Sequence, residues 1–411
     1  MKEQKGKIWS KYFIIIMAAA FFTAMCMNML DSTLSLLASD LWDSKTLGGY
    51  LTSVFNAGSI AMAFVSGRLV DKKGRRFCFL VAASCFAGAT CVMAIWPVPA
   101  VALIVRFVQG IAKGLAMVAA TSIVSDIIPK ERLGEGMGLY GLGQTIPKAL
   151  GPMVGLMIAA SGNYTMMLVL CAVSYACAGL MVLGIDYEKK QGKSESTGKE
   201  ELYDAGKYKG IWKLIEKKAL AASINYTVFF FSTGIILVFM SVYARDILEI
   251  PTGQISVFYV TSAVVGTVVR LAFSKISDKY GALWMIIPGH IAQIISLVLL
   301  AFFSKGNLVA FYTAGALYGI GTSATMPTYN AVAVADSPKG RNGVANAAFY
   351  CIMDVGMLLA SAILGNMIDA AESAAAGFRN AYLLSILVCV GSAVMSLICF
   401  NEKARERRRN S

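Results

Sequence analysis

Twelve stretches of about 20 mostly apolar residues, separated by short polar connections, make up most of this chain. As a helix, such a stretch crosses roughly 30 Å of hydrocarbon. We expect helices and not barrel strands, because backbone polar groups in lipid must be satisfied within the segment and no alternating pattern is present. The sequence therefore predicts an all-α integral membrane protein. The predicted spans are 12–37, 47–66, 77–96, 100–124, 137–160, 166–185, 219–243, 255–273, 283–303, 308–334, 344–368 and 381–400.

Composition supports a membrane environment. Of the 411 residues 57% are apolar and 15% are charged, whereas soluble domains have about 25% charged residues. The net charge of +13 does not require a nucleic-acid partner, because the basic residues lie in the connections between apolar spans. We expect the lipid bilayer to cover most of the surface.

The distribution of basic residues predicts that both termini are cytoplasmic. With that orientation the only Lys and Arg residues in outer loops are Lys45, Arg245, Lys305 and Arg379. The first span is too long for a cleaved signal peptide, so we expect it to remain as a helix. We predict a multi-pass protein of the cell membrane, of bacterial type.

The two halves of the chain repeat each other. The charged glycine turn at 67–76 recurs in weaker form at 274–281, and Gly110 and Gly319 occupy corresponding positions. Several matches in the same order indicate a duplicated six-helix unit. We predict two pseudo-symmetric bundles, at 1–185 and 219–411, joined by a cytoplasmic linker at 186–218 that is rich in Lys, Glu, Gly and Ser.

The turn at 67–76, in this topology, resembles the signature loop of the major facilitator superfamily, and the other motifs resemble its proton-coupled drug and metabolite efflux branch. The resemblance implies twelve transmembrane helices and transport by alternating access. It also implies a cytoplasmic gate, in which glycines permit a turn and close approach while basic side chains stay in cytoplasmic water or at lipid headgroups. The second copy departs from the pattern at Ser274 and Ala282. The gate residues are Gly67, Asp71, Gly74, Arg75, Asp278 and Gly281.

The fourth predicted span has a polar face. Arg106, Gln109, Gly110, Lys113 and Met117 share one side of a helix by their spacing. Charged groups at membrane depth must face protein or water, so we expect this face to line a cleft. Arg106 and the glycines after it resemble the family's fourth-helix motif, which implies a role in proton transfer.

Two acids lie well inside the spans, Asp31 and Asp354. Asp31 is about six residues and Arg106 about seven from the outer ends of their spans, so both would lie roughly 10 Å deep and could meet. Protonation of Asp31 would then depend on water in the cleft and on the nearby guanidinium. We expect Asp31, Arg106 and Asp354 to couple transport to protons; the alternative is a permanent ion pair between Asp31 and Arg106 that only fixes packing.

The fifth span combines Lys148 with a series of glycines and prolines. Lys148 would pair with Asp354 or meet an anionic substrate. The series resembles the exporter motif of the family's fifth helix, and the alternative for any one glycine is ordinary helix packing. Its members are Gly143, Pro147, Gly151, Pro152 and Gly155.

Further polar residues are candidates for hydrogen bonds in an otherwise apolar cleft. His290 lies in a peripheral span of the family fold, so we expect a structural role for it. The candidates for substrate contact are Asn28, Lys113, Gln144, Lys148, Asn225, Tyr226 and Tyr329. Weaker candidates are Asn56 and Asn330, with apolar walls drawn from Met27, Phe55, Met117, Phe229, Phe230 and Met326.

Signatures of soluble enzymes are missing from the sequence. It has no phosphate loop, nucleophile elbow or metal-binding helix, and its nine cysteines lie in apolar spans without metal-like spacing. We expect no enzyme activity, no cofactor, no metal and a monomer. The leading hypothesis is a proton-coupled exporter of a small amphiphilic compound. The alternatives are an exporter of an anionic metabolite, such as a carboxylate-bearing metal chelator, and a non-transporting receptor or regulator with the same fold.

Overall fold

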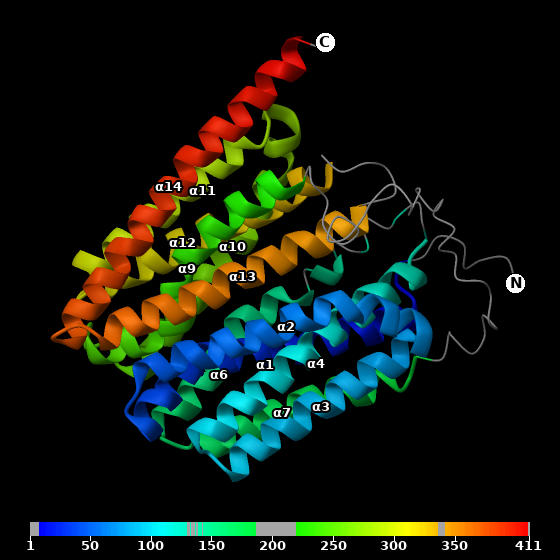
Figure 1. Ribbon diagram of the computed structural model, residues 1–411, viewed down its shortest axis with the longest axis horizontal. Coiled ribbons are helices and arrows are strands. Elements are labelled where there is room, and N and C mark those ends of the chain that lie inside the picture. Colours follow the sequence, from blue (N-terminus) through cyan, green and yellow to red (C-terminus); the bar gives the residue numbers. More distant parts are fainter. Residues whose placement is uncertain are drawn as a thin grey trace, which may run out of the picture. The chain divides into compact units, whose positions relative to one another are not determined.

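The structure is a computed structural model composed of long helices (Figure 1). The predicted linker 186–218 lies outside the described residues. The structure describes residues 8–129, 132, 136, 139–141, 143–185, 219–335 and 342–409, without the side chains of 64, 273–279, 342–343 and 401–409.

The helices follow the predicted apolar spans and extend beyond several of them. In the first half they are α1 (Lys11–Trp42), α2 (Lys45–Lys73), α3 (Arg75–Ile95), α4 (Pro99–Ile127), α6 (Thr145–Ala160) and α7 (Tyr164–Val182). In the second half they are α9 (Leu220–Asp246), α10 (Thr252–Tyr280), α11 (Leu283–Phe302), α12 (Leu308–Ala335), α13 (Asn342–Asp369) and α14 (Ala374–Arg409).

Within the described ranges, nine helices are long and apolar enough to cross a membrane, and α2 makes a tenth if its two parts, bent by 57°, form one span. Two predicted spans are not among these. The described part of α6 has 16 residues, and α12 carries glycine, threonine and tyrosine among its apolar residues. The all-helical membrane fold is confirmed, whereas the total of twelve spans and the cytoplasmic termini stay predictions.

Two glycines form the turns between helices that the repeat in the sequence predicts. Gly74, between α2 and α3, has φ 93°, and Gly281, between α10 and α11, has φ 98°. These are left-handed conformations that side chains other than glycine adopt at a cost. The turn glycine of the first half therefore recurs in the second.

By its internal contacts the chain forms two compact units. The first comprises 1–34 and 54–199, and the second comprises 35–53 and 200–411. The end of α1 and the start of α2 thus belong to the second unit, although the rest of both helices belongs to the first. The predicted bundle boundaries stay a prediction.

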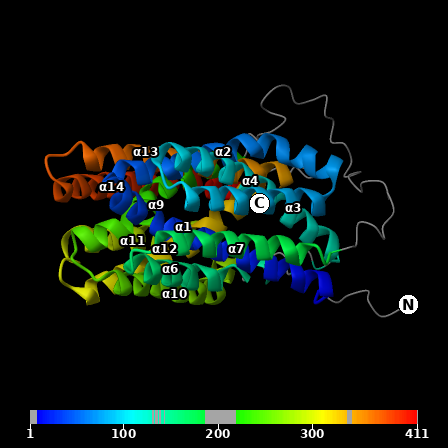
Figure 2. The ribbon, with the colours of Figure 1, turned by 90° about the horizontal axis from the view of Figure 1, so that it is seen from below.

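In the first unit, α3 packs against both α4 and α7 (Figure 2). The rings of Phe86 in α3 and Tyr175 in α7 stack with their centroids 4.0 Å apart. In the second unit, α12 packs against α10 and α11, while α9 packs against α13 and α14. Figure 1 shows α11 and α14 running side by side, in agreement with their contacts.

Close helix crossings at glycines occur in both units. A Cβ at Gly110 in α4 would lie closer than 3.0 Å to the carbonyl oxygen of Phe55 in α2. A Cβ at Gly319 in α12 would lie equally close to the carbonyl oxygen of Ser262 in α10. The correspondence of Gly110 with Gly319 is therefore structural as well as sequential.

The segment 35–53 is held within the second unit by polar contacts to α9 and α13. Its contacts are Asp40 Oδ1 with Arg245 Nη1 at 2.7 Å, Thr46 N with Asp369 Oδ2 at 2.9 Å, Tyr50 OH with Asn366 Oδ1 at 2.8 Å and Ser53 Oγ with Ser361 Oγ at 2.7 Å. Gly49 permits this closeness, because a Cβ there would overlap the carbonyl oxygen of Ser361.

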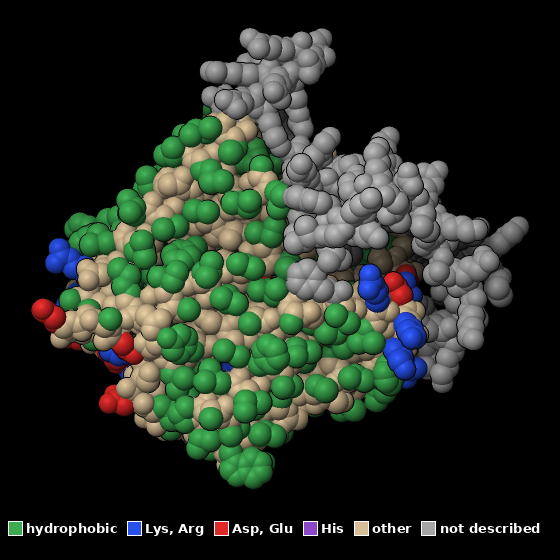
Figure 3. All heavy atoms as spheres, in the orientation of Figure 1, with side chains coloured by type: hydrophobic (Ala, Val, Ile, Leu, Met, Phe, Trp, Pro, Cys, Tyr) green, Lys and Arg blue, Asp and Glu red, His purple; other side chains and the backbone are tan. Residues whose placement is uncertain are grey.

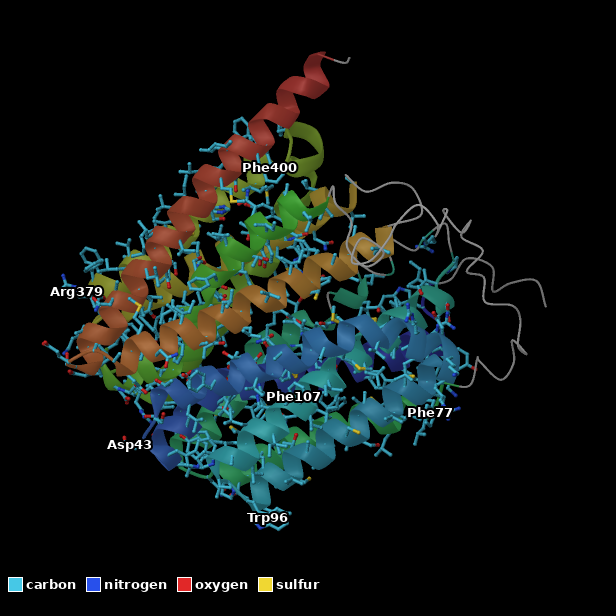
Figure 4. All side chains as sticks on the ribbon, viewed as in Figure 1. Asp43, Phe77, Trp96, Phe107, Arg379 and Phe400 are labelled. Atoms are coloured by element: carbon cyan, nitrogen blue, oxygen red, sulfur yellow. The ribbon has the colours of Figure 1, made fainter. Side chains whose placement is uncertain are left out.

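The lateral surface is apolar. Figure 3 shows hydrophobic side chains along the lengths of the helices and charged side chains gathered near helix ends. Phe77 and Trp96, labelled near the two ends of α3 in Figure 4, are both more than half exposed. Large exposed apolar areas of this kind require a covering phase, and lipid supplies it.

Candidate functional site

The polar face of α4 is buried at Arg106 and Gln109, which are both 0% exposed. Met117, on the same predicted face, is 38% exposed, so a cleft along the whole face stays a prediction. Arg106 Nη1 donates to Gln109 Oε1 at 3.1 Å, and Gln109 Nε2 donates to Thr90 Oγ1 in α3 at 2.9 Å. The Thr90 hydroxyl in turn donates to the carbonyl oxygen of Phe86. A chain of hydrogen bonds therefore fixes Arg106 against α3.

Two side chains of α2 hold the basic groups of α4. The guanidinium carbon of Arg106 lies 4.1 Å from the centroid of the Phe55 ring, and Lys113 Nζ lies 5.8 Å from the same centroid. Ser59, one turn further along α2, has its Oγ 3.1 Å from Lys113 Nζ. Both cations thus contact an aromatic face or a hydroxyl from the neighbouring helix.

Asp31 lies in α1 with an exposed side chain. The helix continues to Trp42, so Asp31 is eleven residues from its end and not about six as predicted, because the helix runs past the apolar residues that defined the span. Its carboxylate lies within electrostatic range of Arg106 and Lys113. Among the described side chains, no ion pair within 4.0 Å joins Asp31 to Arg106, so this structure does not show the permanent pair of the alternative reading.

The predicted gate region has a partner that the sequence did not indicate. Arg75 Nε lies 2.9 Å from Asp126 Oδ2 at the end of α4, and its side chain stays 34% exposed. Asp71 is exposed near the end of α2, and the side chain of Asp278 is outside the described set. Among described residues a Cβ at Gly67 would meet nothing within 4 Å, and its part in a gate stays a prediction.

The glycine and proline series of α6 packs against α1. A Cβ at Gly151 would lie 2.7 Å from Cβ of Asn28, and a Cβ at Gly155 would lie 3.1 Å from Thr33 Cγ2. Pro147 and Pro152 are buried, and Gly143 faces Met17. The series therefore serves close helix packing here, and its link to export stays a prediction.

The remaining candidates of the first unit and α13 differ in burial. Lys148 in α6 is exposed, Gln144 at the start of α6 is half-buried, and Asp354 in α13 is buried at 7% exposure. Asn28 is half-buried and donates its amide to the carbonyl oxygen of Ala24 in its own helix. Their roles in proton and substrate binding stay predictions.

Three candidates of the second half, Asn225, Tyr226 and Tyr329, lie in a buried polar cluster. Asn225 is 0% exposed, and its side chain hydrogen-bonds to Ser392 and Ser396 of α14. Tyr329 bonds to Ser396, and its ring lies 5.6 Å from that of Tyr226. With no exposed edge, Asn225 and Tyr329 fix helices in this structure; a contact to substrate stays a prediction.

His290 belongs to the same cluster. One ring nitrogen lies 2.8 Å from the carbonyl oxygen of Ile286 and the other 3.0 Å from Ser392 Oγ. The ring is 0% exposed and packs against Phe229. These contacts agree with the structural role expected for His290.

The sequence did not indicate the partners of the candidate residues and of His290, which are Thr90, Asp126, Ser392 and Ser396. Each is a small or acidic side chain in an otherwise apolar span, and such residues are common in membrane helices. Phe55 was noted only as an apolar wall. Nothing in the sequence of α2 alone indicates that its ring faces two cations of another helix.

Comparisons with known proteins give one consistent family. The family model described as Major Facilitator Superfamily matches residues 16–361. The multidrug resistance protein MdtG of Enterobacter lignolyticus is 23% identical, with 94% of this chain and 91% of that protein covered. The staphylopine export protein of Staphylococcus aureus is 22% identical, with 72% of each chain covered.

A solved structure has the same fold. The nucleoside transporter NupG matches with a TM-score of 0.75 at 15% identity, covering 95% of this chain and 99% of that one. At this identity the likeness concerns the fold.

Proposed function

The chain belongs to the major facilitator superfamily, and from that premise we propose a secondary active transporter that exports a small amphiphilic or drug-like compound in exchange for protons. Asp31 is the main proton carrier, Arg106 modulates it, and Asp354 is a second carrier. The family and the fold support a transport function. The coupling of transport to protons and its outward direction are our proposal.

The observation that carries the proposal is the setting of Asp31. An ionisable carboxylate within a membrane helix is costly and marks a functional site by default. It keeps an exposed side chain, and Arg106 and Lys113 act on it electrostatically. These two cations contact Phe55 and Ser59 of α2 and Gln109 of α4. A carboxylate of this kind can bind and release a proton as its surroundings change.

Similarity to a multidrug resistance protein favours a drug-like compound. A carrier of such compounds needs an adaptable apolar wall, and Met27 and exposed Met117 are side chains of that kind. Lys113, Gln144 and Asn28 supply polar contacts in the same unit.

The experiment that tests proton coupling compares Asp31→Asn with the wild type in liposomes. A dye enclosed in the liposomes reports lumenal pH while a diverse panel of compounds, ethidium among them, is added. We expect compound-dependent proton flux in the wild type and none in Asp31→Asn, with an unchanged melting temperature. Asp43→Asn is the matched control, because Asp43 is exposed and its positive φ suits asparagine. Full flux in Asp31→Asn would remove Asp31 from the mechanism.

A second candidate substrate is an anionic metabolite, such as a carboxylate-bearing chelator. The similarity to a protein named for staphylopine export favours it, as do the basic side chains Arg106, Lys113 and Lys148. The test measures uptake of iminodiacetate and of ethidium into inside-out vesicles. Lys113→Ala and Lys148→Ala should lower iminodiacetate transport and spare ethidium; equal transport of iminodiacetate by the variants and the wild type counts against this candidate.

A further inference from the structure

The crossing of α2 and α4 is fixed by backbone contacts. A Cβ at Gly58 in α2 would overlap the carbonyl oxygen of Phe107, and one at Gly110 in α4 would overlap that of Phe55. Gly114, one turn on, leaves 3.2 Å from its Cβ position to the carbonyl oxygen of Ser59. Glycines on both helices bring the backbones together, so side chains beside the crossing have little freedom to move.

This crossing places the Phe55 ring directly over Arg106. The guanidinium carbon is 4.1 Å from the ring centroid, the ring is 5% exposed and the arginine is fully buried. A cation over an aromatic face is attracted by the ring quadrupole, and removal from water strengthens that attraction. The ring and the Gln109 amide therefore hold the guanidinium from two sides.

The charged and titratable groups around this pair come from several helices. Arg106 and Lys113 of α4 act on Asp31. Cys26 of α1 and Cys171 of α7 lie within electrostatic range of Arg106, and α6, which packs on α1, carries Lys148. Among the described groups, Arg106 and Lys113 are thus the cations that act on Asp31, and both contact Phe55.

We propose that Phe55 is a positioning residue for proton transfer, whose ring keeps the Arg106 guanidinium on the α2–α4 crossing and so prevents a lasting ion pair with Asp31. The proposal rests on the proposed role of Asp31 as proton carrier. With the guanidinium held, Asp31 senses a nearby positive charge and still exchanges its proton. Without the ring, the guanidinium reaches the carboxylate and keeps it ionised.

The test needs no substrate. Infrared spectroscopy of the purified protein in lipid vesicles follows the carbonyl band of a protonated carboxyl group during a pH titration, and Asp31→Asn identifies the contribution of Asp31. Phe55→Leu removes the aromatic face and keeps an apolar side chain, whereas Phe55→Tyr keeps the face. Phe55→Met replaces Phe55→Leu if the latter does not fold.

At the pH where Asp31 is half protonated in the wild type, we expect its ratio of protonated to ionised form to fall at least about tenfold in Phe55→Leu and to stay near the wild-type value in Phe55→Tyr. A wild-type titration in Phe55→Leu overturns the proposal. So does a loss of the same size in Phe55→Tyr, or a wild type in which Asp31 gives no titrating band. Retained proton flux in Asp31→Asn overturns the proposed function and with it the link of Phe55 to proton transfer. The infrared titration of Asp31 in Phe55→Leu decides separately whether the ring keeps the Arg106 guanidinium from the carboxylate.

Discussion

Gly110 has no room for a side chain, because even a Cβ would collide with the backbone of Phe55. Gly110→Ala should lower stability by about 1–3 kcal/mol, the usual cost of forcing atoms into a packed site. Gly88→Ala in α3 is the matched control, since nothing described lies within 4 Å of its Cβ position. It should be neutral or stabilise by up to about 1 kcal/mol.

Thermal unfolding followed with a thiol-reactive dye gives the melting temperatures of both variants. Cys26, Cys78, Cys171 and Cys389 are buried thiols outside disulfides and become reactive when the protein unfolds. Equal melting temperatures for Gly110→Ala and Gly88→Ala would contradict the close crossing of α2 and α4.

Asn225 supports another prediction for a single residue. Its amide is fully buried and serves Ser392 and Ser396, which link onward to His290 and Tyr329. Asn225→Ala should lower stability by about 1–3 kcal/mol, because buried hydroxyls lose their partner. The dye assay measures the loss; unchanged stability together with lost transport would instead favour the substrate role predicted from the sequence.

At the scale of elements, the first turn of α2 is capped by another helix. Thr46 donates its backbone N–H and its hydroxyl to Asp369, the last residue of α13. An anion at the N-terminus of a helix satisfies backbone donors and faces the positive end of the helix dipole. Asp369→Ala should therefore cost about 0.5–2 kcal/mol of stability, comparable with the loss of an N-cap. Glu372→Ala, at an exposed neighbour, is the control, and equal melting temperatures of the two variants would exclude the cap.

Helix positions and turns follow from local rules, and this is why they could be predicted. Apolar runs specify the spans, and glycine specifies the turns at Gly74 and Gly281. The extension of α1 to Trp42 could not be predicted, because Ser39 and Asp40 interrupt the apolar run and the last turn is held by contacts to distant residues, such as that of Asp40 with Arg245. The burial of Asn225 likewise depends on two serines 167 and 171 residues away.

For the whole molecule, the repeat predicts independent contributions from the two units. Gly110 and Gly319 make equivalent crossings in different units. Their alanine variants should each destabilise the protein, and the double variant should show the sum within about 0.5 kcal/mol, as expected for sites without shared partners. The measurement is equilibrium unfolding of the three variants; strong non-additivity would mean that the two crossings are energetically coupled.

At the same scale, the sequence was informative about the cations of α4 but not about what holds them. The spacing of Arg106, Gln109, Gly110, Lys113 and Met117 predicted one face that lines a cleft. Arg106, Gln109 and Gly110 are buried while Met117 is exposed, so the cleft stays a prediction. The contact of Arg106 with Phe55 arises from the angle and depth at which two helices cross, and neither is written in the sequence of one helix. Whether Asp31 and Arg106 meet during transport depends on the same crossing angles and stays a prediction.

Helices α1 and α2 are both helical at residues 34 and 54, where the chain passes from one compact unit to the other, and the bend of α2 lies further along it. No loop is available at residues 34 and 54 to serve as a pivot. A transport cycle in this chain therefore has to bend the backbone of α1 and α2, or break the contacts of residues 35–53 with α9 and α13. In either case the stiffness of these two helices becomes a determinant of the rate of turnover.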